Sequence, residues 1–221
     1  MKFKKKLIIT AAIAAFVVSG AFGVNSILKN NEVEVAASNI DISKLPVQQM
    51  RGSFVYDVND KSEAVGISDY VFVGKVVSNN GTTYRDIVTV EDENGDPKEV
   101  GTPYTSYTIQ VLDDIKGKLK KDVPIDILKH GGITQDKQSV FVFENDELPE
   151  ADKSYIFLGY AQPDGSILIS GPNSNIPLDV TETQLTKQNL NSSKEYQEYQ
   201  EAFQFQDTKF KRERFTSKYE E

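Results

Sequence analysis

The stretch from Ser68 to Val77, S-D-Y-V-F-V-G-K-V-V, constrains the fold more than any other part of the sequence. It is the densest apolar segment outside the N-terminus, and it is rich in β-branched and aromatic residues. Polar and turn-forming residues bound it, with Ser68-Asp69 at the start and Ser78-Asn79-Asn80-Gly81 after it. This pattern predicts a strand buried on both faces, against which the later strands must pack.

Further strand patterns follow along the chain. In the segment from Thr105 to Ile115, Tyr107, Ile109 and Val111 share one face of an extended chain. Residues 92–97 form a turn-rich segment between two extended arms. Other strands are predicted over residues 54–58, 82–90, 123–130, 139–144, 154–161, 166–170 and 176–180. Several short strands at this spacing predict a barrel or sandwich.

Two helices are predicted. Asp60 and Ser62 can cap a short helix over residues 63–67, which leads into the central strand. Ser192-Ser193-Lys194-Glu195 fits a capping box and starts an amphipathic helix over residues 192–219, with a bend near Asp207. Its aromatic residues fall on two faces: Tyr196, Tyr199, Phe203 and Phe210 on one, and Phe205, Phe215 and Tyr219 on the other. Packing on the barrel is the favoured interpretation, and partner or membrane-surface binding are the alternatives.

The N-terminus has the features of an export signal. Four lysines lie within residues 1–6, and residues 7–24 carry no charge. An 18-residue helix spans roughly 27 Å, so the run fits either a cleaved signal peptide or a retained membrane anchor. Val35-Ala36-Ala37 offers small residues for cleavage before Ser38, and Ala21-Phe22-Gly23 is an earlier, weaker alternative. The lysine asymmetry predicts that residues 38–221 face outward.

These features divide the chain into four parts. Residues 1–37 are the signal peptide or anchor, and residues 38–53 are a polar linker. Residues 54–181 form the β-barrel domain, and residues 182–221 form the C-terminal helical segment. The predicted fold is mainly β, a small OB-like barrel with a short preceding helix and a C-terminal amphipathic helix.

Composition excludes several classes of function. Beyond residue 37 the chain has 20 basic and 31 acidic side chains, a net charge of about −11, which disfavours binding to nucleic acid. The chain has no cysteine and one histidine. Thiol nucleophiles, iron–sulfur clusters and multi-histidine zinc sites are therefore excluded. A cysteine-free exported chain also fits a bacterium better than an animal.

Three patterns in the sequence are candidate sites of chemistry. Asp92, Asn94 and Asp96 alternate as in a calcium loop, but prolines occupy the positions of the required glycine and glutamate. A solvated turn is the favoured interpretation, with a weak calcium site as the alternative. His130 before two glycines is a candidate general base, yet no serine motif accompanies it. Paired carboxylates are common, but the sequence does not select a pair for glycoside hydrolysis.

The order of elements resembles a known group of proteins. The stretch S-D-Y-V-F-V-G-K-V-V is followed by Y-T-S-Y-T-I-Q-V-L-D-D-I-K-G, then K-S-Y-I-F-L-G-Y and a hairpin into I-S-G-P-N. Over about residues 60–175 this resembles the OB-fold domain of metalloproteinase inhibitors and netrins, and even more the uncharacterised exported proteins of Gram-positive bacteria with the same pattern. The animal inhibitors chelate zinc through an N-terminal cysteine, and disulfides hold their domain. This chain has neither, so no functional residue is transferred.

The leading hypothesis is a non-enzymatic binding module, extracellular or anchored outside the cytoplasmic membrane of a Gram-positive cell. OB barrels bind ligands with a strand face and the flanking loops. The candidate ligand-binding residues are Tyr84, Arg85, Tyr104 and His130. The expected partner is an extracellular protein or envelope polymer, with no metal or other cofactor and no membrane contact except through residues 7–24. The alternatives are a hydrolase of envelope polymer or peptide, and an extracellular protease inhibitor acting through a freed N-terminus.

Overall fold

The computed structural model describes residues 33–35, 42–92, 94–178 and 187–221. The predicted signal or anchor over residues 7–24 and the cleavage position at Ser38 therefore lie outside the described residues. Within those described ranges, no helix has both the length and the apolar character needed to cross a membrane.

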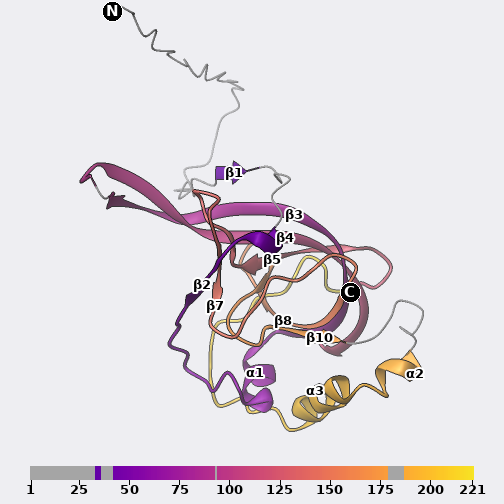
Figure 1. Ribbon diagram of the computed structural model, residues 1–221. Helices are drawn as coiled ribbons and strands as arrows, with labels where there is room; N and C mark the ends of the chain where they lie inside the picture. Colours follow the sequence, from indigo (N-terminus) through magenta and orange to yellow (C-terminus); the bar gives the residue numbers. More distant parts are fainter. Residues whose placement is uncertain (1–32, 36–41, 93, 179–186) are drawn as a thin grey trace, which may run out of the picture.

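Five strands close into a small mixed β-barrel (Figure 1). They are β3 (Tyr70–Glu91), β4 (Pro97–Lys116), β5 (Ile125–His130), β8 (Ser154–Ala161) and β9 (Ile167–Ile169). The order around the barrel is β3-β4-β5-β9-β8, and β8 pairs with β3 to close it. All pairings are antiparallel except that of β5 with β9. This confirms the predicted mainly β, OB-like fold.

The predicted central strand is the start of β3 and has the expected burial. Five consecutive residues, Tyr70 to Gly74, are buried, so both faces are covered. One face contributes Phe72 to the barrel interior, where it stacks on Phe157 at 5.4 Å between ring centroids. The other face contributes Val71 and Val73 to a second apolar cluster beneath the helices. The early part of β3 thus joins the two halves of the core.

The ends of β3 and β4 leave the barrel as a long two-stranded arm (Figure 1). The arm ends in a turn where the Asp92 carboxylate accepts hydrogen bonds from the backbone N–H groups of Asn94 and Asp96. Val88 and Val100 lie opposite each other on one face and are 56% and 37% exposed. The two extended arms predicted around this turn are confirmed, as continuations of the barrel strands.

A second, smaller sheet covers one part of the barrel. It consists of β2 (Val47–Met50), β7 (Val140–Phe143) and β6 (Gly132–Ile133). Because β2 pairs in parallel with β7, residues 47–50 form a strand within the segment expected to be an irregular linker. Two short strands extend the larger sheet, β1 (Val33–Val35) beside β3 and β10 (Asn175–Leu178) beside β8. A 3₁₀ turn, η1 (Ile42–Lys44), precedes β2.

The helices pack against the outside of the barrel, close to one another (Figure 1). They are α1 (Lys61–Ile67), α2 (Lys187–Leu190) and α3 (Lys194–Gln204). The Asp60 carboxylate caps α1 as predicted, accepting from the N–H groups of Ser62 and Glu63. Ser193, and not Ser192, caps α3. Tyr196 and Tyr199 are buried against the barrel, which supports the packing interpretation of this helix.

Two predicted elements are wrong. Residues 54–58 do not form a strand, and the C-terminal helix ends at Gln204 instead of residue 219. The backbone after α3 bonds mainly to the barrel and α1. Asp207 N–H donates to Ser62, and Lys218 N–H donates to Gly165. We call residues 205–221 the C-terminal strap; in it, tertiary contacts override the helical spacing of the aromatic residues.

Candidate functional site

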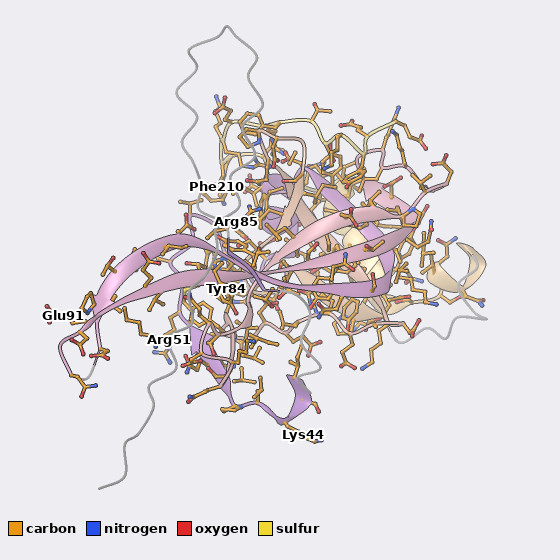
Figure 2. The ribbon with its side chains drawn as sticks, turned by 90° about the horizontal axis from the view of Figure 1, so that it is seen from above. Lys44, Arg51, Tyr84, Arg85, Glu91 and Phe210 are labelled. Atoms are coloured by element: carbon orange, nitrogen blue, oxygen red, sulfur yellow. The ribbon has the colours of Figure 1, made fainter. Side chains whose placement is uncertain are left out.

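Three of the four predicted site residues form one stack at the base of the arm. Arg85 on β3 lies over the ring of Tyr104 on β4, with 5.5 Å from its guanidinium carbon to the ring centroid. Tyr104 in turn stacks on His130 of β5 at 4.7 Å. The three residues meet because β3, β4 and β5 are neighbours in the sheet. Figure 2 shows Arg85 where the arm leaves the barrel, far from Glu91 at its tip.

Tyr84 is not part of this stack. Its side chain is only 2% exposed, and its hydroxyl donates a 2.9 Å hydrogen bond to the carbonyl of Ile133. Adjacent residues in a strand point to opposite faces, which separates Tyr84 from Arg85. The structure therefore places Tyr84 in a packing position that ties β3 to β6.

His130 has a serine neighbour that the sequence did not reveal. Its Nδ1 lies 3.2 Å from Oγ of Ser170, which follows β9 in the chain. Its Nε2 is buried and has no hydrogen-bond partner among the described residues. Burial, and to a smaller extent the charge of Lys129, lower the pKa of His130 to about 4, and Asp86 opposes the shift. The imidazole is therefore neutral at pH 7 and a weak base.

This burial predicts that acid destabilises the fold through His130. The unfolded chain, with a histidine pKa near 6.5, takes up a proton before the folded chain does. The contribution of the neutral ring to the free energy of unfolding is therefore complete above pH 6.5 and is lost as the pH falls toward 4. We expect a loss of about 1–2 kcal/mol in unfolding free energy, since the partly exposed ring reduces the full effect.

Urea denaturation at pH 7 and pH 4.5 tests this for the full chain and for His130→Phe, which keeps an aromatic ring in the stack. The chain has no other histidine, so the difference between the two proteins isolates this group. Equal pH dependence in both proteins would show that His130 does not titrate in this way.

A cavity of about 410 Å³ lies between the barrel, the second sheet and the loop that follows β7. Its volume falls in the range of roughly 300–1,000 Å³ that is typical of small-molecule sites. Most of the wall is apolar. The apolar side chains that line it are Ile42, Val47, Tyr107, Val140, Val142, Leu148, Pro149 and Ala151.

Tyr107, one of the lining residues, carries an unsatisfied polar group. The residue lies on β4 and is fully buried, and its hydroxyl has no hydrogen-bond partner among the described residues. A buried hydroxyl without a partner costs roughly 1–3 kcal/mol, so native proteins rarely leave one unpaired. Burial raises the pKa of Tyr107, as do the nearby Tyr155 and Asp146. The hydroxyl is therefore protonated at all physiological pH values and is able to donate a hydrogen bond.

A buried ion pair adjoins the same wall. Lys129 Nζ lies 2.6 Å from the carboxylate of Asp146, and it also donates to Ser174 Oγ at 2.7 Å. The two charged side chains are 0% and 1% exposed. Burial lowers the pKa of Lys129 and raises that of Asp146, and each charge opposes the shift of the other. Asp146 lines the cavity, and the ion pair holds its carboxylate in place.

The sequence could not select these residues. The alternation of apolar and polar residues correctly predicted that Tyr107 points inward. It does not show whether the hydroxyl has a hydrogen-bond partner. Asp146 is one of several carboxylates in an acidic segment, and Lys129 is an ordinary residue of a strand pattern. Only the long-range packing of β4, β5 and the loop after β7 shows that these three groups share one end of the barrel.

The other candidate patterns do not converge into a metal site. Within the described ranges, no three acidic or histidine side chains are grouped so that they could hold a metal ion. Asp113 and Asp114 both lie 3.3 Å from Lys121, and Asp113 also accepts from the hydroxyl of Tyr196. Asp113 and Asp114 therefore have a structural role in these ion pairs.

Comparison with known proteins adds no assignment. No family model matches the chain, and no curated protein matches it in sequence. What is established is a small five-stranded mixed β-barrel domain with helices on one side.

Proposed function

We propose that this protein is a non-enzymatic binding module that works outside the cytoplasmic membrane and takes a small, mainly apolar ligand into the 410 Å³ cavity. The observation that carries this proposal is the buried, unpaired hydroxyl of Tyr107, a residue of the mainly apolar cavity wall. A ligand group bonded to that hydroxyl would remove its desolvation cost, while the apolar wall would cover the rest of the ligand.

The export part of the proposal rests on the basic start and the uncharged run over residues 7–24. A Gram-positive cell envelope or medium is the proposed location, with an extracellular protein or envelope polymer as further partner. The order of the barrel strands supports the proposed kinship with netrin-like domains. The acidic net charge supports the absence of nucleic acid among the ligands.

A hydrolase is the second candidate, because Ser170 and His130 lie within hydrogen-bond reach. It ranks lower because the second ring nitrogen has no carboxylate partner and the lowered pKa weakens the base. Hydrolysis of p-nitrophenyl acetate that is lost in Ser170→Ala would support it. Equal hydrolysis rates in the original chain and in Ser170→Ala would exclude the hydrolase hypothesis. The inhibitor alternative depends on a freed Ser38, which lies outside the described residues.

Titration with the fluorescent probe N-phenyl-1-naphthylamine tests the cavity. We expect saturable binding of one probe per chain with a dissociation constant in the micromolar range, on the order of −8 kcal/mol. Val142→Phe extends a buried side chain into the cavity and should weaken binding at least tenfold. Val140→Phe on the same strand serves as a second variant.

The matched control is Val123→Phe, the same substitution at a valine that is 44% exposed and does not line the cavity. It should bind the probe as the original chain does. Binding that is absent, non-saturable or equal in all four proteins would contradict the proposal.

A further inference from the structure

The charge on the cavity wall selects among apolar ligands. The charged residues that line it are all acidic: Asp146, Glu147 and Glu150. Glu150 pairs with Lys153 at 2.8 Å, and Asp146 pairs with Lys129. Glu147 is exposed and makes no ion pair with another described residue. The mouth of the cavity therefore carries net negative charge, which attracts cations and repels anions.

Lys129, the buried cation beside the cavity, is not available to bind an anionic ligand. Lys129 is fully buried, does not line the cavity, and already donates to Asp146 and Ser174. An anionic ligand would have to break the ion pair to reach it, which would leave Asp146 as an uncompensated buried charge. A carboxylate or phosphate head group is thus disfavoured.

Hydrogen-bond chemistry points to the same ligand class. The hydroxyl of Tyr107 accepts as well as donates, and a carboxylate such as Asp146 only accepts. A head group that serves both must be a donor. An alcohol satisfies this requirement, and an ammonium group adds attraction to the acidic mouth.

We infer that the ligand is an apolar amine whose nitrogen binds between Tyr107 and Asp146 and whose tail lies on Val140, Val142 and Leu148. This rests on the proposed function, because it assigns a ligand class to the same cavity. The closest test is a series that shares one tail and differs only in its head group: octan-1-amine, octan-1-ol and octanoate.

Calorimetric titration of the full chain at pH 7 measures the three affinities. We expect the amine to bind roughly 5–10-fold more tightly than the alcohol and at least 30-fold more tightly than octanoate. Equal affinities, or tightest binding of octanoate, would overturn the inference and leave the cavity as a binding site. Failure of all three compounds to bind would instead overturn the proposed function.

Two variants separate the contributions. Tyr107→Phe removes only the unpaired hydroxyl, so it should fold normally and weaken the amine and the alcohol alike by about fivefold. Glu147→Gln should weaken only the amine. The control is Glu144→Gln, a partly exposed carboxylate that pairs with Arg51 and does not line the cavity. Unchanged amine affinity in both Tyr107→Phe and Glu147→Gln would contradict the assignment.

Discussion

Replacement of Lys129 by methionine is expected to lower the free energy of unfolding by about 3–5 kcal/mol. Methionine has a similar length and keeps the side chain packed, but it removes the only cation that Asp146 contacts among the described residues. The carboxylate would then be a buried charge without a counter-ion, or would take up a proton at neutral pH. Urea denaturation at pH 7 measures the loss directly.

The double variant Lys129→Met with Asp146→Leu provides the control. Removing both charges leaves no uncompensated buried charge, and replacing a buried ion pair by apolar side chains is often neutral or stabilising. We expect the double variant to recover most of the lost stability. A single variant that costs less than about 1 kcal/mol would show that the pair is not buried as described.

Gly66→Ala is expected to cost up to about 3 kcal/mol by separating the C-terminal strap from α1. A methyl group at this position would lie 1.8 Å from the backbone carbonyl oxygen of Asp207, a distance that no side-chain rotation relieves. The strap also holds Arg212 and Arg214 on the carboxylate of Asp69, which is 6% exposed. Displacement at residue 207 would disturb both ion pairs.

Limited trypsin digestion together with thermal unfolding measures this effect. Cleavage in the Gly66→Ala protein should become fast at Lys209, Lys211, Arg212 and Arg214, and the melting temperature should fall. Ser62→Ala on the same helix removes an oxygen and adds no atom near residue 207, so it should remain protected. Equal protection of the two proteins would show that α1 and the strap are not in close contact.

Much of the fold follows from local sequence patterns. The central strand has one face toward the barrel interior and the other toward the helices, so an uninterrupted apolar run from Tyr70 to Gly74 predicts it. Alternation predicts β4 because Tyr107, Ile109 and Val111 face the interior while Thr108 and Gln110 face outward. The cap at Asp60 predicts α1, since a short side chain with an oxygen acceptor is what the first N–H groups require.

The rest depends on contacts between distant parts of the chain. The strap after Gln204 has helical spacing in its aromatic residues, but bonds to Ser62 and Gly165 determine its course. Ser170 meets His130 only because β5 and β9 pair in parallel. The four residues predicted from the sequence do not line the cavity, whose wall includes the buried Tyr107, Val140 and Val142. A strand pattern shows that Tyr107 is inside, but not that its hydroxyl lacks a partner.

The most direct test of the binding site is an NMR measurement of contacts between bound N-phenyl-1-naphthylamine and the protein, with valine and leucine methyl groups labelled in the full chain. The proposed site predicts intermolecular Overhauser effects from the probe to the methyl groups of Val140, Val142 and Leu148. Contacts that fall instead on the exposed valines of the arm, Val88 and Val100, would contradict it.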